Sequence, residues 1–283
     1  MDKKICQMVT DRLCAEMEKG IIPWSKPWHG KGGAISHSTG KPYSLLNQFI
    51  LNRPGEYITF NQCHAEGGKI KKGAKGLPVV FWKQIRIKET NKDGEQTEKL
   101  IPMLKYYTVF HIEDCEGIKA KYADRADRPH ADPITEAEEI VTAYQQREKL
   151  RIIRDRESDK AFYSPTRDFI QVPCIEQYTA ASEYYSTLFH EMTHSTGHRS
   201  RLARFTGSAA AAAFGSTEYS KEELVAEIGA ATINSHCGIE TPASFRNSAA
   251  YLQGWLSALR KDPTMIITAA GKAEKAVNYI LNA

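Results

Sequence analysis

Residues 180–197 read AASEYYSTLFHEMTHSTG and contain the pattern H-E-x-x-H from His190 to His194. The spacing of apolar residues predicts a helix through this stretch, which Gly197 ends. Residues four apart on a helix lie one turn apart on the same face, so both imidazoles can bind one divalent metal ion. Glu191 directly follows the first histidine, where its carboxylate can act as general base on a metal-bound water.

A later stretch, KEELVAEIGAATI, supplies candidate partners for the two histidines within a helix predicted over residues 220–236. Glu223 and Glu227 are four residues apart and share one face of that helix. The pattern resembles zincin proteases with a glutamate ligand, and this resemblance implies Glu223 as third ligand and Glu227 as the residue that orients a ligand histidine. Glu227 as the ligand is the alternative. The small Ala226 and Ala230 suit close packing against the histidine helix. Two imidazoles favour Zn²⁺, with Mn²⁺ as the second choice.

Residues around the motif suggest how a peptide would bind. Residues 151–173 predict two strands joined by a turn at residues 165–168. We expect the strand at residues 168–173 to edge the active-site cleft, where a zincin pairs with an extended peptide. Tyr163 and Tyr219 are candidate hydrogen-bond donors to a transition-state oxyanion.

Positive charge is concentrated in the first half of the chain. Residues 1–130 contain 22 Lys and Arg against 15 Asp and Glu, whereas the remaining residues contain 16 against 19. Residues 69–88 contain seven basic residues and no acidic residue, which indicates a surface that faces phosphate groups. Helices and strands are both predicted in this half, including strands over residues 78–88 and 104–115, so we expect an α+β fold.

The polar, proline-containing stretch at residues 120–133 predicts a linker. We therefore expect two domains, residues 1–128 and residues 129–283. The second domain is mostly helical in this prediction, and the alanine-rich residues 208–216 are expected to form a loop.

Aromatic residues are interleaved with the basic stretch of the first domain. Single-stranded nucleic acid needs flat side chains that stack on bases and cations that contact phosphates. The candidate DNA contacts of this kind are Trp24, Trp28, Tyr43, Lys69, Lys71, Lys72, Lys75, Trp82 and Lys83.

The chain as a whole resembles the ArdC-type antirestriction proteins of plasmids and other mobile elements. The resemblance rests on PWSKPW (23–28), TGKPYSLLN (39–47), GGKIKKGAKG (67–76), YYSTLFHEMTHSTGHRSRL (184–202) and YSKEELVAEIGA (219–230), among other segments. It implies an N-terminal domain that binds single-stranded DNA, with Asn47 as a further candidate contact, and a C-terminal zincin-like metallopeptidase domain. It also implies protection of incoming plasmid DNA against host restriction.

Three functions follow from these residues. The first is an antirestriction protein that binds single-stranded DNA and cleaves a host protein at its metal site. The second is a non-catalytic protein that masks single-stranded DNA and has a structural or vestigial metal. The third is a metal-dependent nuclease, although such sites are usually richer in carboxylates. The composition excludes wholesale disorder. The sequence has no run of about 18 apolar residues, so we expect no membrane-spanning helix. Six scattered cysteines indicate reduced thiols and a cytoplasmic protein.

Overall fold

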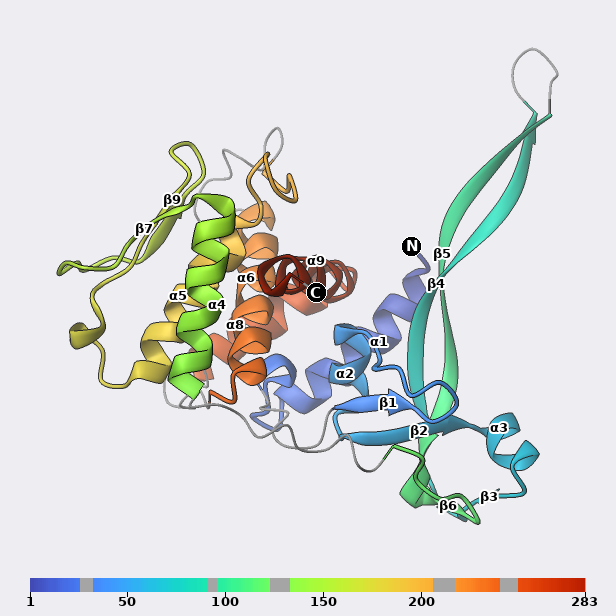
Figure 1. The fold of residues 1–283 in the computed structure, drawn as a ribbon. Helices are drawn as coiled ribbons and strands as arrows, with labels where there is room; N and C mark the ends of the chain where they lie inside the picture. The colour runs from blue at the N-terminus through green and yellow to red at the C-terminus, as the bar shows by residue number, and fades with distance from the viewer. Residues whose placement is uncertain (26–32, 91–95, 123–132, 206–216, 240–248, 283) are drawn as a thin grey trace.

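The computed structural model describes residues 1–25, 33–90, 96–122, 133–205, 217–239 and 249–282. Helices and β-sheets occur in both halves of the chain, which confirms the predicted α+β class (Figure 1). The alanine-rich residues 208–216 and the predicted domain boundary at residue 128 lie outside the described residues. No helix in the described ranges is long and apolar enough to cross a membrane.

The N-terminal half begins with an amphipathic helix, α1, whose apolar residues recur at every fourth position and whose first turn is capped by the Asp2 carboxylate. The elements that follow are short, apart from two long strands. In chain order they are α1 (Lys3–Met17), η1 (Pro23–Ser25), β1 (Ala34–Ser36), α2 (Leu45–Leu51), β2 (Gly55–Thr59), α3 (Phe60–Ala65), β3 (Lys69–Ile70), β4 (Leu77–Thr90), β5 (Gln96–His111), η2 (Ile112–Asp114) and β6 (Cys115–Glu116).

Four of these strands form one sheet in the order β1-β2-β5-β4. β1 pairs with β2 in parallel, and the other pairs are antiparallel. β4 and β5 pair from Leu77 opposite Val109 to Thr90 opposite Gln96, so they continue as a two-stranded ribbon past the end of β2 (Figure 1). β3 and β6 form a separate small sheet at the base of this ribbon.

The C-terminal half consists mainly of helices, with one small sheet beside them. Its elements are α4 (Pro133–Glu148), β7 (Arg151–Ile153), β8 (Phe162–Ser164), β9 (Phe169–Gln171), η4 (Ile175–Gln177), α5 (Ala181–Ser195), α6 (Thr217–His236), α8 (Ala249–Lys261) and α9 (Met265–Leu281).

The small sheet differs from the two strands predicted over residues 151–173. It has three strands in the order β7-β9-β8, with β7 parallel and β8 antiparallel to β9. The prediction that residues 168–173 form the cleft-edging strand is therefore wrong, because β9 is paired on both sides. β7 and β8 are the outer strands of this sheet.

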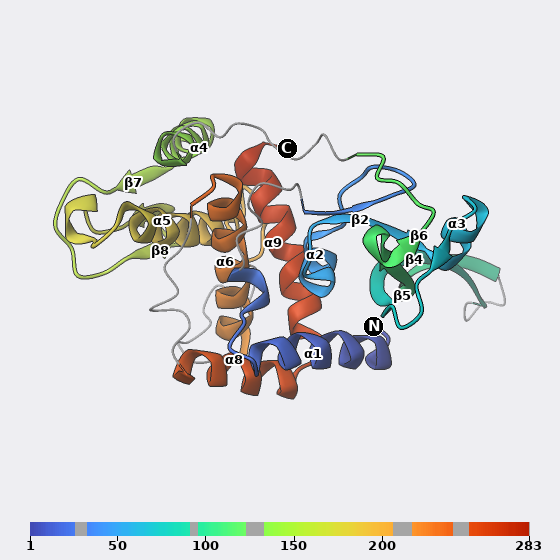
Figure 2. The same ribbon diagram turned by 90° about the horizontal axis from the view of Figure 1, so that it is seen from below.

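The helices at the start of the chain complete the core of the C-terminal half. α1 lies along α8, and α2 lies beside α9 (Figure 2). Val9 and Leu13 of α1 share one apolar cluster with Leu256 and Leu259 of α8, and all four side chains are buried. The two halves are therefore held together by a common core as well as by the chain that joins them.

Candidate nucleic-acid interface and metal centre

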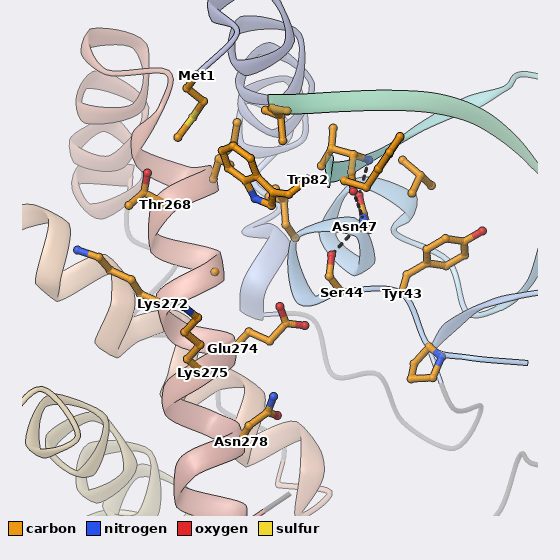
Figure 3. A pocket seen from close by; sticks show the side chains of 18 of the residues that line it. Met1, Tyr43, Ser44, Asn47, Trp82, Thr268, Lys272, Glu274, Lys275 and Asn278 are labelled. Carbon is orange, nitrogen blue, oxygen red and sulfur yellow. Dashed lines mark hydrogen bonds between the residues drawn. The ribbon is translucent and has the colours of Figure 1, made fainter. Parts of the chain in front are cut away.

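Two of the predicted DNA contacts are buried in the structure and do not present a surface to DNA. Trp24 is 2% exposed and packs edge-on against Trp255 of α8, with ring centroids 6.2 Å apart. Asn47 is 3% exposed, and its side-chain amide donates to the Val80 carbonyl and accepts from the Val80 amide (Figure 3). Both side chains serve the core, since Trp24 fills the contact between the halves and Asn47 joins α2 to β4.

Most of the remaining predicted contacts are exposed. Lys69, Lys71, Lys72 and Lys75 are exposed on β3 and on the loop that leads into β4. Trp82 and Lys83 are exposed further along β4, and Tyr43, which is half-buried, precedes α2. Trp28 lies outside the described residues.

The ribbon also carries exposed aromatic residues that are not among the candidate DNA contacts. They are Phe81 on β4 and Tyr106 and Tyr107 on β5. The antiparallel register places Tyr106 opposite Val80 and Trp82 opposite Leu104, and the Phe81 and Tyr107 rings lie 5.6 Å apart. The signal in the sequence was two aromatic pairs, FW and YY, on strands joined by a hairpin. The sequence did not predict that helices cover only part of the ribbon, which leaves these rings exposed.

The metal centre depends on a close approach of α5 and α6. Gly229 of α6 faces Thr193 of α5, and a Cβ at Gly229 would lie 2.5 Å from the Thr193 Cγ2 atom. Ala226 and Ala230 are fully buried beside it, as their small size predicted. These small residues let the two helix backbones come together, so that a glutamate on α6 reaches the histidines on α5.

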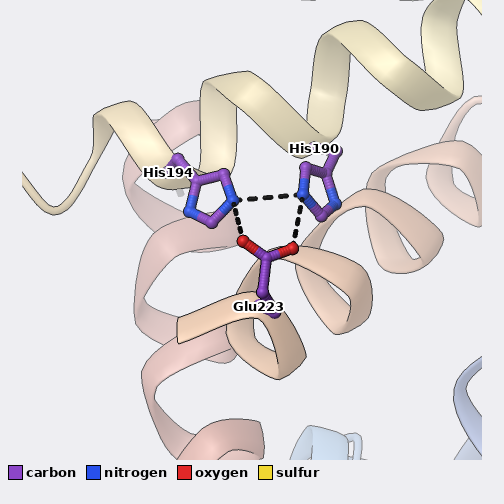
Figure 4. Close-up of side chains that lie close together, drawn as sticks. All are labelled: His190, His194 and Glu223. Carbon is purple, nitrogen blue, oxygen red and sulfur yellow. Dashed lines mark hydrogen bonds and ion pairs between the residues drawn. The ribbon is translucent and has the colours of Figure 1, made fainter. Parts of the chain in front are cut away.

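The structure brings the donor atoms of His190, His194 and Glu223 within 4.8 Å of one another (Figure 4). The two Nε2 atoms are 3.1 Å apart, and each lies 3.4 Å from a different oxygen of Glu223. Ligand atoms about 2.0–2.1 Å from a tetrahedral ion are about 3.3–3.4 Å from one another. The observed spacing therefore fits a divalent ion bound by these three side chains.

A carboxylate also faces the second nitrogen of each histidine. Glu227 Oε1 lies 3.9 Å from His190 Nδ1, on the side where the sequence analysis expected an orienting residue. Glu222 Oε1 lies 3.5 Å from His194 Nδ1, a contact that the sequence analysis did not predict. Carboxylates in this position fix the tautomer and ring orientation of metal-binding histidines.

Arg204 holds Glu222 in place. Its side chain is 5% exposed and donates to Glu222 Oε1 at 2.7 Å, to Thr196 Oγ1 at 2.6 Å and to the Thr193 carbonyl at 2.8 Å. The arginine therefore ties the Glu222 side chain to the C-terminal end of α5. Sequence spacing gave no signal for this pair, because Arg204 follows α5 in an irregular segment.

The carboxylates around the two histidines strongly stabilise positive charge at this site. Burial opposes protonation of His194, but contacts with Glu222 and Glu223 outweigh it and raise its pKa to about 10. Burial would raise the pKa of Glu223, yet both histidines hold it well below its usual range. Glu191, which is 7% exposed on α5, adds to the negative potential at His194. The same potential favours a divalent cation.

Tyr163 does not have the oxyanion role expected of it. Its hydroxyl donates to Asp168 Oδ1 at 2.7 Å, and Arg201 donates to the same tyrosine oxygen. The Arg201 side chain is buried, pairs with Asp168, and also donates to the Ser195 carbonyl at the end of α5. This cluster anchors β8 and β9 to the histidine helix. The side chain of Tyr219 lies outside the described part of the chain.

Comparison with known proteins gives matches along nearly the whole chain. The N-terminal domain of anti-restriction factor ArdC matches residues 3–110, and a zincin-like metallopeptidase family matches residues 136–272. Crystal structures of the antirestriction protein ArdC from plasmid R388, metal-free and Mn(II)-bound, are 34% and 33% identical with TM-scores of 0.74 and 0.73. Each match covers 100% of this chain, and 97% and 98% of those chains.

Longer relatives contain a region similar to this entire chain. Two DNA primases TraC from Escherichia coli are 32% and 31% identical over 99% of this chain, which spans only 27% and 20% of their lengths. An uncharacterized protein y4eC from Sinorhizobium fredii is 28% identical over 98% of this chain and 91% of its own length.

Proposed function

Since this chain belongs to the ArdC antirestriction family, we propose that it protects incoming plasmid DNA from host restriction by combining single-stranded DNA binding with a metal-dependent peptidase site. His190, His194 and Glu223 would hold the metal ion, and Glu191 would be the general base. The observation that carries the proposal is the spacing of 3.1–3.4 Å among the three donor groups, which matches a tetrahedral ion. Zn²⁺ is the expected ion and Mn²⁺ the alternative, because imidazole ligands suit both.

The metal, when bound, polarises the scissile carbonyl and lowers the pKa of a water. The side chains of this chain perform the remaining tasks. Glu191 takes a proton from the attacking water as the new carbon–oxygen bond forms, and then delivers it to the leaving amine nitrogen as the peptide bond breaks. Glu222 and Glu227 keep the Nε2 atoms of the histidines turned toward Glu223. The substrate would be a host protein met at the DNA.

A second function is favoured by the exposed aromatic and basic side chains of the ribbon. These side chains, among them Trp82 and Lys83, lie on the other half of the chain from the metal site and need no metal to bind DNA. In this alternative the protein masks single-stranded DNA, and the metal only stabilises the fold.

Plasmid transfer into a restricting host separates the two functions. Unmodified plasmid would be transferred in the presence of wild type, Glu191→Gln or Glu183→Gln at matched expression. Glu183 lies in the first turn of the same helix and serves as the matched control. Loss of protection with Glu191→Gln alone supports the peptidase, whereas equal protection by all three proteins supports masking. Bound metal, measured after purification, should be the same in all three proteins.

A nuclease would reveal itself in a different assay. Metal-dependent cleavage of labelled DNA by wild type, lost in Glu191→Gln, would replace the peptidase proposal.

A further inference from the structure

A groove of about 750 Å³ separates the ribbon from the C-terminal helix α9 (Figure 3). Tyr43, Trp82 and Tyr107 line it from the N-terminal half, and Lys272 and Lys275 line it from α9. Its size is within the range of about 300–1,000 Å³ typical of ligand pockets, which accommodates a nucleotide. The groove is distinct from the metal centre, because none of the three donor residues lines it.

The groove places flat rings opposite cations. Trp82 is 50% exposed, and Lys272 and Lys275 are both exposed, one helical turn apart within α9. Among the described residues that line the groove, Glu274 is the only acidic one. Its carboxylate accepts from the Leu45 amide at 3.0 Å, which commits it to the first turn of α2. The balance of charge in the groove therefore favours an anion.

The wall around Trp82 is also held in a fixed position. Asn47 bonds to both backbone groups of Val80, two residues before Trp82 on the same face of β4. Ser44 accepts a further hydrogen bond from the Asn47 amide at 3.0 Å. The indole therefore projects from a strand that is tied to α2, and the aromatic surface is preorganised for a ligand.

We propose that single-stranded DNA passes through this groove, with a base stacked on Trp82 and phosphates on Lys272 and Lys275. This inference rests on the proposed single-stranded DNA binding and extends it, because it makes the C-terminal half part of the DNA site. An unpaired base exposes a face for stacking, whereas the bases of a duplex stack on one another. An exposed ring beside two lysines thus selects a single strand.

Fluorescence anisotropy of the full chain with a labelled oligothymidine tests the inference. The informative variant is Lys272→Gln with Lys275→Gln. Its matched control is Lys149→Gln with Lys160→Gln, two exposed lysines of the same half that do not line the groove. Each lost phosphate contact should reduce the slope of log binding constant against log salt concentration by about 0.7. Between 1 M and 0.1 M salt this amounts to an about fivefold smaller gain in affinity. The groove variant should therefore bind about 25-fold more weakly at 0.1 M salt, with a slope shallower by about 1.4.

Trp82→Ala tests the stacking part of the proposal, and wild type and the groove variant distinguish its failure from failure of the proposed function. It should weaken binding by about tenfold or more through the lost stacking. If wild type does not bind the oligonucleotide, both the DNA-binding function and the groove are refuted. If wild type binds but the groove variant has the affinity and salt slope of its control, DNA binding remains and the role of α9 is overturned. Circular dichroism of each variant would establish that the fold is retained.

Discussion

Gly229 allows α6 to approach α5, so adding one methyl group at this position should disturb the metal centre. In Gly229→Ala, the new Cβ would lie 2.5 Å from Thr193 Cγ2, 2.6 Å from Oγ1 and 3.1 Å from Cβ. Thr193 has little freedom to rotate, because its hydroxyl donates to the Phe189 carbonyl at 2.8 Å inside a buried interface. Normal carbon–carbon contact is about 3.5–4.0 Å, so the two helices must separate by roughly 1 Å.

The expected loss can be worked out from this displacement. Overpacking of this kind costs about 1–3 kcal/mol, and the better helix propensity of alanine returns about 1 kcal/mol. Net destabilisation should be about 0–2 kcal/mol, which lowers Tm by up to roughly 8 °C for a chain of this size. The metal site should suffer more, because metal–ligand distances tolerate only about 0.2 Å and Glu223 moves with α6. We expect the affinity for Zn²⁺ to fall by about 10–100-fold, as for other disturbed metal-site supports.

Gly254→Ala is the matched control for this variant. Gly254 lies in α8, is exposed, and has nothing within 4 Å of an added Cβ. The same substitution there should raise stability by up to about 1 kcal/mol and leave metal affinity unchanged. Thermal unfolding after removal of metal by a chelator gives the stability, and competition with a coloured chelator gives the affinity. If Gly229→Ala behaves like Gly254→Ala in both assays, the close-approach argument is refuted.

Two other predictions concern the core and the response to acid. Leu13→Ala, at a fully buried position of α1, should lower the free energy of unfolding by about 2–5 kcal/mol and shift the urea midpoints of metal binding and DNA binding together. Leu100→Ala, at a 59% exposed position, should lower it by under about 0.5 kcal/mol. Loss of metal binding and loss of DNA binding at two separate urea midpoints would contradict a common core. Burial raises the pKa of Asp168, but Arg201 and Tyr163 outweigh this and hold it below its ordinary value of 3.8. The stability from this carboxylate is therefore present above pH 3.8 and is lost as the pH falls through the folded-state pKa. Asp168→Asn should destabilise the protein by about 1–3 kcal/mol at pH 7 and by less at pH 3, as measured by urea unfolding. An equal loss at both pH values would show that the charge is irrelevant.

The sequence predicted best what depends on local geometry. The four-residue spacing of His190 and His194 fixes both on one helix face whatever surrounds them, and the same rule placed Glu223 and Glu227 together on α6. The structure brings the donor atoms of His190, His194 and Glu223 within 4.8 Å of one another, and their role as metal ligands stays a prediction.

The sequence could not reveal contacts made by segments distant along the chain. The pairing of Arg204 with Glu222 requires the chain to turn back after α5, and no spacing rule predicts that turn. The central position of β9 follows from a parallel pairing with β7, whereas a hairpin would have left β9 at an edge. Trp24 was expected at the surface because it stands in a proline-rich, basic stretch. It is buried by α8, more than 200 residues later in the chain.

The core shared by α1, α2, α8 and α9 also affects truncation of the chain and recombination of its gene. A chain cut between residues 110 and 136 would leave Leu13 and Val9 exposed on one fragment and Leu256 and Leu259 exposed on the other. Each fragment would then have an exposed apolar surface and would tend to aggregate. We therefore expect recombination to move the two halves together. The matches to the long primases agree with this expectation, because each covers 99% of this chain and therefore includes both halves.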